Sequence, residues 1–159
     1  MRLPGVKKLP DGSYISQKSG MDIDGTTALR EGLIGSTIAE YDPDLLIVDK
    51  EPTGFRGELL PTLEKLRNST KTRIILGLRD VLDEPDVLAV EWARKNAIEA
   101  TERFYDEVWV YGPRSVYDPT QGLPLSDETR KRIHWTGYLR REIIDPAEVP
   151  DEPLSLIHI

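Results

Sequence analysis

A segment of ten residues, 49–58, carries side chains that could take part in chemistry. It reads Asp49-Lys50-Glu51-Pro52-Thr53-Gly54-Phe55-Arg56-Gly57-Glu58. Asp49 or Glu51 would supply a carboxylate, and Arg56 or the backbone N–H groups at the start of the next helix would hold an anion or hydroxyl groups. We take Asp49 as a candidate catalytic residue and predict that the segment contacts substrate through Lys50, Glu51, Gly54, Arg56 and Gly57.

A second interpretation of this segment stays open. Glycine lets a ligand approach the backbone closely, but it also reaches positive φ values in turns that bind nothing. Gly54 and Gly57 would then belong to a solvated turn between a strand and a helix.

A second group of candidates follows the next apolar run. Asp80 could accept a proton from a hydroxyl nucleophile, with Arg79 orienting it or lowering its pKa. The alternative is a structural ion pair between these two residues. Tyr111 follows a third apolar run, and we predict that Arg79 and Tyr111 bind substrate.

Short apolar runs alternating with helical patterns must position these residues. The spacing predicts strands at 45–48, 73–78 and 107–111, helices at 26–41, 58–67, 86–105 and from Ser126, and a last short strand within 133–139. The first 25 residues predict loop with one short strand. Continuous apolar strands are typical of a parallel sheet buried on both faces, so we expect an α/β, Rossmann-like, doubly wound fold. Ligands bind outside the carboxyl ends of such strands, which would bring Asp49, Arg79 and Tyr111 to one rim.

Composition excludes several kinds of protein. The chain has 159 residues, no cysteine and a formal net charge of -7 with acids and bases interleaved, which disfavours thiolate metal sites and nonspecific nucleic-acid binding. No apolar run is long enough to cross a membrane, so we expect a cytoplasmic protein. We find no metal-binding, nucleotide-triphosphatase or esterase motif, and expect neither a metal nor a cofactor.

Several segments, in order along the chain, carry a resemblance to a known family. They are Pro43-Asp44-Leu45-Leu46-Ile47-Val48-Asp49-Lys50-Glu51-Pro52, Gly57-Glu58-Leu59, Leu76-Gly77-Leu78-Arg79-Asp80-Val81-Leu82-Asp83, Tyr105-Asp106-Glu107-Val108-Trp109-Val110-Tyr111-Gly112 and Thr136-Gly137-Tyr138-Leu139. Over roughly residues 3–145 the chain resembles bacterial predicted glycosyltransferases, which are similar to glycosyltransferase family 28 and to the GlcNAc transferase of peptidoglycan synthesis.

The resemblance implies a GT-B architecture, in which an N-terminal domain binds the acceptor and a C-terminal domain binds the nucleotide-sugar donor. The chain would be the N-terminal, acceptor-side half of such a transferase. Its partners would be a sugar or glycoconjugate acceptor and the donor-binding domain, and membrane association of the parent protein stays open.

The resemblance also implies that the domain is incomplete at both ends. The family's first strand, its loop with glycine and histidine, and the donor-binding domain have no counterpart in the chain. We divide the chain into a loop-rich start (1–25), a Rossmann-like acceptor-side domain (26–139), the start of an interdomain linker (140–153) and a tail that resembles a sequencing remnant (154–159).

Two other functions fit parts of the pattern. A receiver-like signalling domain would use Asp49 as phosphoacceptor, but it also needs an acidic pair and a later lysine that we do not find. A noncatalytic α/β binding module would have the same strands and loops.

Overall fold

The fold is α/β and is built around a parallel sheet flanked by helices, which confirms the predicted α/β class. The described strands follow one another in sequence order, so the expected double winding is not seen in this part of the chain. The computed structural model describes residues 3–10, 13–18, 20–68, 71–79 and 85–138. Four strands lie in the order of the sequence: β3 (Leu45–Asp49), β4 (Arg73–Arg79), β5 (Glu107–Tyr111) and β6 (Ile133–Trp135). All three pairings are parallel, so the carboxyl ends of the strands share one edge of the sheet.

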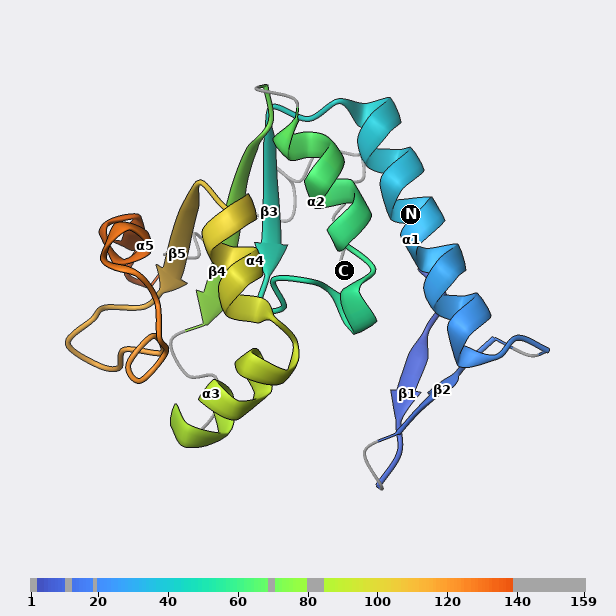
Figure 1. Cartoon of the computed structure of the whole chain (residues 1–159), viewed down its shortest axis with the longest axis horizontal. Coiled ribbons are helices and arrows are strands. Elements are labelled where there is room, and N and C mark those ends of the chain that lie inside the picture. The colour runs from blue at the N-terminus through green and yellow to red at the C-terminus, as the bar shows by residue number, and fades with distance from the viewer. Residues whose placement is uncertain (1–2, 11–12, 19, 69–70, 80–84, 139–159) are drawn as a thin grey trace, which may run out of the picture.

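Two of the five helices in the described part of the chain cover one face of this sheet. The five helices are α1 (Ile23–Tyr41), α2 (Leu60–Arg67), α3 (Pro85–Arg94), α4 (Ala97–Phe104) and α5 (Asp127–Lys131). In Figure 1, α2 and α4 lie in front of the sheet, and α1 runs beside α2. The core between these layers includes Val48, Leu63, Ile74, Leu76, Leu78, Ala100, Phe104, Val108 and Val110. Burial of these alternate strand residues fixes the register, because a shift by one residue would expose them.

The first strand of this sheet differs from the prediction. All five inner residues of β4 are buried, as a strand covered on both faces requires. In β3, however, Leu45 and Ile47 are 44% and 43% exposed whereas Val48 is 2% exposed. The expectation that β3 is buried on both faces was wrong, because an apolar run shows that a strand forms but does not show what covers its second face.

Two helix boundaries also differ from the prediction. The helix expected over 86–105 is interrupted between α3 and α4, where Asn96 has a φ of 52° and its N–H bonds to Ala93 O. Asparagine tolerates this left-handed conformation better than most residues. The helix expected from Glu58 begins at Leu60, because a 3-10 turn (Phe55–Gly57) precedes it. Pro61 lies in the first turn of α2, where its missing N–H leaves no bond unmade.

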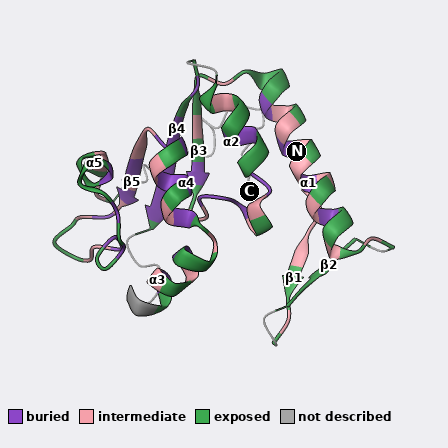
Figure 2. Cartoon of the chain, in the orientation of Figure 1, coloured by how far each residue is buried: buried purple, intermediate pink, exposed green. Residues whose placement is uncertain are grey.

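The N-terminal residues form a hairpin in place of the expected loop with one strand. Strands β1 (Val6–Lys8) and β2 (Tyr14–Ser16) pair in antiparallel register, and Figure 2 shows that the hairpin is mostly exposed or intermediate. It is attached to α1 through the Ser16 and Thr26 hydroxyls, which are 2.7 Å apart. Helix α1 itself begins at Ile23, three residues before the predicted start, because Asp22 caps it.

At the other end, the described chain finishes shortly after β6. Ser126 caps α5 as its sequence predicts, by accepting the Thr129 N–H. The proposed linker (140–153) and tail (154–159) lie outside the described residues.

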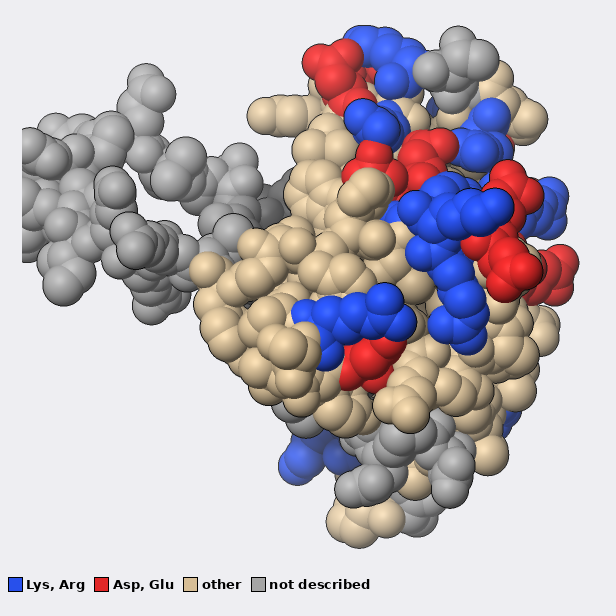
Figure 3. Space-filling model, turned by 90° about the vertical axis from the view of Figure 1, so that its left-hand side faces the viewer, with Lys and Arg blue, Asp and Glu red and all other residues tan. Residues whose placement is uncertain are grey.

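On the face that includes α5, Figure 3 shows acidic and basic side chains lying next to each other. No helix in the described part of the chain is both long enough and apolar enough to cross a membrane.

Candidate functional site

A cavity of about 600 Å³ lies beside the carboxyl end of β3. Four parts of the chain form its wall: strand β2, helix α1, the segment after β3, and the junction of α3 with α4. The lining residues are Tyr14, Arg30, Val48, Asp49, Glu51, Thr53, Gly54, Phe55, Arg56, Gly57, Glu58, Leu59, Leu60, Arg94, Lys95 and Asn96. The cavity is therefore at the edge of the sheet where α/β proteins bind ligands.

The segment after β3 has an unusual backbone. Lys50, Gly54, Arg56 and Gly57 all have positive φ, at 65°, 69°, 51° and 84°. Lysine and arginine reach this region only at a cost of about 1 kcal/mol or more, and such residues persist where surrounding contacts hold them. At Gly54 a Cβ would also lie 2.7 Å from Leu59 Cγ, so a side chain is excluded there by space as well as by conformation.

A buried ion pair holds this segment against α1. Arg30 Nε and Nη2 donate to the two carboxylate oxygens of Glu58 at 2.6 and 2.7 Å, and Arg30 Nη1 donates to Pro4 O at 2.9 Å. One oxygen of Glu58 also accepts the Phe55 N–H. The two side chains are 10% and 0% exposed. The pair thus ties together the start of the hairpin, α1 and the strained segment.

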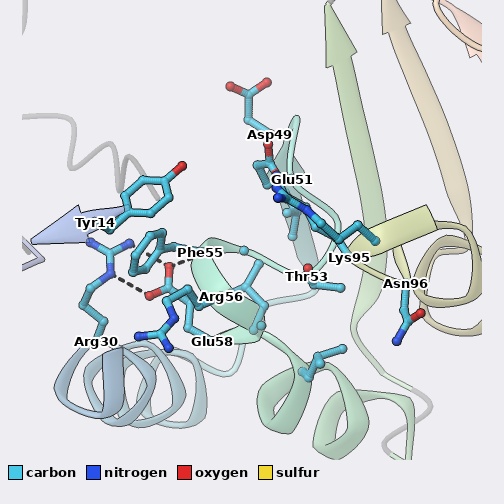
Figure 4. Close-up of a pocket in the computed structure, with 16 residues that line it drawn as sticks. Tyr14, Arg30, Asp49, Glu51, Thr53, Phe55, Arg56, Glu58, Lys95 and Asn96 are labelled. Atoms are coloured by element: carbon cyan, nitrogen blue, oxygen red, sulfur yellow. Dashed lines mark hydrogen bonds and ion pairs between the residues drawn. The ribbon is translucent and has the colours of Figure 1, made fainter. Parts of the chain in front are cut away.

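Two aromatic rings form the hairpin side of the cavity. The rings of Tyr14 and Phe55 meet edge to face, with centroids 4.9 Å apart and planes at 70°. The Arg30 guanidinium lies 5.8 Å from the centroid of the Phe55 ring. Figure 4 shows both rings next to the Arg30–Glu58 pair, which is marked by dashed lines.

Charged side chains form the opposite side. Lys95 Nζ lies 2.8 Å from Glu51 and 2.7 Å from Glu91. Burial alone would lower the pKa of Lys95, but its hydrogen bonds to the two carboxylates outweigh burial and raise that pKa. The same contact lowers the pKa of Glu91. Lys95 is therefore a cation fixed between two acids.

The structure brings Asp49, Arg79 and Tyr111 together at the rim. Asp49 pairs in register with Gly77, and Arg79 with Tyr111, so all four residues lie on the same face of the sheet. Arg79 Nη2 is 3.5 Å from Asp49 Oδ2, and the Tyr111 ring extends over Gly77. Burial, and to a smaller extent the negative charge of Asp49, raise the pKa of the Tyr111 hydroxyl.

The residues predicted from the sequence fall into three groups. Those that line the cavity are Asp49, Glu51, Gly54, Arg56 and Gly57. Arg79 and Tyr111 lie beside Asp49 at the rim. Lys50 does not line the cavity, and its backbone N–H donates to Gly77 O. Asp80 lies outside the described residues.

Sequence reasoning missed several residues of the cavity wall, namely Tyr14, Arg30, Phe55, Lys95 and Asn96. Phe55 lies within the predicted segment, so its position next to Arg56 was a usable signal. Tyr14, Arg30 and the neighbours Lys95 and Asn96 come from three separate parts of the chain, and no spacing in the sequence links these parts. Among the described residues, no three histidine, aspartate or glutamate side chains gather closely enough to hold a metal ion.

Comparison with protein-family models, with curated proteins and with solved structures finds no match for this chain.

Proposed function

We propose that this chain supplies the acceptor side of a glycosyltransferase, with Asp49 as the base that accepts a proton from the attacking hydroxyl. The observation that carries the proposal is the position of Asp49. Asp49 lines the cavity, its side chain is 47% exposed, and its ion-pair contact with Arg79 is 3.5 Å long. Carboxylate oxygens have about four acceptor positions, so Asp49 retains capacity for a ligand hydroxyl.

The chemistry would be an inverting transfer. The acceptor hydroxyl loses its proton to Asp49 as its oxygen attacks the anomeric carbon of a nucleotide sugar, and the nucleotide diphosphate leaves. Arg79 orients the carboxylate, and Tyr111 closes the rim over Gly77. Asp80 remains a second candidate for the base. Donor binding falls to a further domain, as the family resemblance implies, and we place the parent protein in a bacterial cytoplasm.

The experiment is a binding comparison between an acceptor-like sugar and a donor. The isotope-labelled chain is titrated with methyl β-glucopyranoside and, separately, with UDP-glucose, and backbone amide shifts are recorded. We expect the glucoside to shift amides of residues 49–58 and of Lys95, and UDP-glucose to leave them unshifted and to be neither hydrolysed nor transferred. Asp49→Asn should weaken glucoside binding, because an amide accepts fewer hydrogen bonds than a carboxylate.

Three results would contradict the proposal. One is a set of amide shifts at the cavity with UDP-glucose and none with the glucoside. Another is turnover of UDP-glucose by the 159-residue chain. The third is phosphorylation of Asp49 by acetyl phosphate, which would support the receiver-like alternative.

A further inference from the structure

We infer that the cavity binds an uncharged pyranose, with the apolar face of the sugar ring packed on Tyr14 and Phe55. The inference rests on the proposed function and makes it more specific, because it names the class of acceptor and the surface that selects it. Tyr14 belongs to the N-terminal hairpin, so the hairpin becomes part of the binding site.

The rings of Tyr14 and Phe55 are accessible to a ligand, and contacts within the protein hold them in place. Tyr14 is 37% exposed, and Phe55 is half-buried. Phe55 is fixed by the bond from its N–H to Glu58, by the Arg30 guanidinium and by its edge-to-face contact with the Tyr14 ring. A pyranose has one face made largely of C–H groups, and covering it with a rigid aromatic surface removes apolar area from water at little cost in conformational entropy.

The polar side of the cavity can receive the hydroxyl groups of such a ring. Figure 4 shows Glu51 and Lys95 across the cavity from Tyr14 and Phe55, with Asp49 above them. These side chains provide both acceptors and donors, as a sugar hydroxyl requires. Asn96 adds an amide on the same side, and its side chain makes no capping bond to α4.

The charges of the wall favour a neutral ligand. Most of the charged lining side chains already have a partner of opposite sign: Arg30 with Glu58, Arg56 with Asp24, Lys95 with Glu51, and Asp49 with Arg79. A phosphate or carboxylate that bound to one of these paired bases would have to displace its acid, and the acid would then lose its partner. Hydroxyl groups can bond to both members of a pair without separating them. Arg94 alone among these side chains has no ion-pair partner within the described residues.

The volume of the cavity limits how large the ligand can be. Pockets of about 300–1,000 Å³ hold drug-sized ligands, which are larger than one sugar ring. The cavity, at about 600 Å³, falls in the middle of that range. A single pyranose would therefore fill part of it, which leaves room for a second ring or an aglycone of the acceptor.

The experiment compares two sugars that differ only at C6, methyl β-glucopyranoside and the anionic methyl β-glucuronide. Affinities come from amide-shift titrations, and contacts of the ring C–H groups come from saturation-transfer NMR. We expect Tyr14→Ala to weaken glucoside binding roughly five- to tenfold, the effect of losing one aromatic contact. Tyr14→Leu keeps an apolar side chain on the hairpin, so it should weaken glucoside binding less than Tyr14→Ala does. Tyr41→Ala is the matched control, because Tyr41 is 78% exposed at the far end of α1.

The results separate this inference from the proposed function. Failure of the glucoside to bind at the cavity would remove the proposed function. Glucoside binding at the cavity that both Tyr14 variants leave unchanged would overturn the aromatic subsite and leave the proposed function standing. Tighter binding of the glucuronide, lost in Arg94→Ala, would overturn the assignment of a neutral ligand. Tighter binding of the glucoside than of the glucuronide, with weaker C–H signals in Tyr14→Ala, supports the inference.

Discussion

Two arginine–carboxylate pairs border the same cavity and differ in how far water reaches them. In the first, Arg30 donates hydrogen bonds to both carboxylate oxygens of Glu58, and the two side chains are 10% and 0% exposed. In the second, Arg79 meets one oxygen of Asp49 at 3.5 Å, and the side chains are 66% and 47% exposed. The buried carboxylate accepts three hydrogen bonds from protein groups and is closed to water, whereas the open one can still accept from a ligand. The comparison indicates that Glu58 holds the cavity wall together, whereas the Asp49 carboxylate stays open to a ligand.

A third pair is intermediate between these two. Arg67 Nη1 lies 2.6 Å from Asp106 Oδ1, and the side chains are 46% and 28% exposed. Asp106 Oδ2 also accepts the Ile74 N–H at 2.8 Å, which ties the start of β4 to the turn before β5. The three pairs therefore form a series, and the energetic effect of removing the carboxylate should fall along it.

Glu58→Ala should have the largest effect on stability. It leaves the Arg30 guanidinium buried without its counterion, and such a change costs about 3–5 kcal/mol of unfolding free energy. Urea denaturation followed by tryptophan fluorescence would measure the loss. Asp24→Ala is the control, because its ion pair with the lining residue Arg56 is exposed and worth about 1 kcal/mol or less.

A double substitution tests whether the buried charge is the cause. Arg30→Met combined with Glu58→Leu removes both charges and keeps apolar volume, so it should recover much of the stability lost in Glu58→Ala. A Glu58→Ala variant that loses no more than Asp24→Ala would refute the distinction between the buried and the open pair.

This distinction could not have been predicted from the sequence. The apolar runs predicted β3, β4 and β5 to within a residue, because buried parallel strands leave a strong local pattern. They also placed Asp49, Arg79 and Tyr111 at one rim, since parallel strands end at one edge. Local patterns do not predict which side chains are buried, because whether Leu45 is covered depends on residues far from it in sequence.

The wall of the cavity depends on contacts between distant segments. Arg30 lies 28 residues before Glu58, and nothing in either local sequence indicates that they meet. The positive φ of Lys50 and Arg56 has no signature either, because neither residue type favours that conformation. Asn96 is different: asparagine is a known left-handed residue, and its presence within the predicted helix 86–105 was a signal for the break.

Asp106→Asn should have an intermediate effect that depends on pH. Burial would raise the pKa of Asp106, but the Ile74 N–H and Arg67 outweigh burial and lower it from its ordinary value of 3.8. A lowered pKa in the folded state means that the carboxylate stabilises the fold above pH 3.8 and loses this effect as pH falls through the folded-state pKa. We expect a loss of about 1–2 kcal/mol at pH 7.

Denaturation curves from pH 7 down to pH 3 test this prediction. The difference between the original chain and Asp106→Asn should shrink as the pH falls below about 4. Asp44→Asn serves as the control, because Asp44 is 90% exposed at the start of β3. A difference that stays constant down to pH 3 would show that the charge of Asp106 plays no part.

Gly77→Ala should displace the Tyr111 ring, which lies over Gly77 next to the Asp49–Arg79 pair. A Cβ at residue 77 would lie 2.1 Å from Tyr111 Oη and 2.7 Å from Cζ, so the ring must move away. We expect urea denaturation to show a loss of about 1 kcal/mol of unfolding free energy, the lower end of the range for inserting a methyl group into a packed site. In a Tyr111→Ala background the same substitution should have almost no effect, and an equal loss in both backgrounds would contradict the steric explanation.

Asp49→Asn should have the smallest effect on stability and a specific effect on Tyr111. The exposed pair with Arg79 is worth at most about 0.5 kcal/mol, so unfolding should change little. Burial and the charge of Asp49 both raise the pKa of Tyr111 above its ordinary value of 10.0, so removing the charge should lower that pKa while burial keeps it raised. Ultraviolet titration of tyrosinate, with a Tyr111→Phe variant to identify the signal, would measure the shift. Asp44→Asn should leave the Tyr111 titration unchanged, and an unchanged titration in Asp49→Asn as well would mean that Asp49 and Tyr111 do not share one rim in solution.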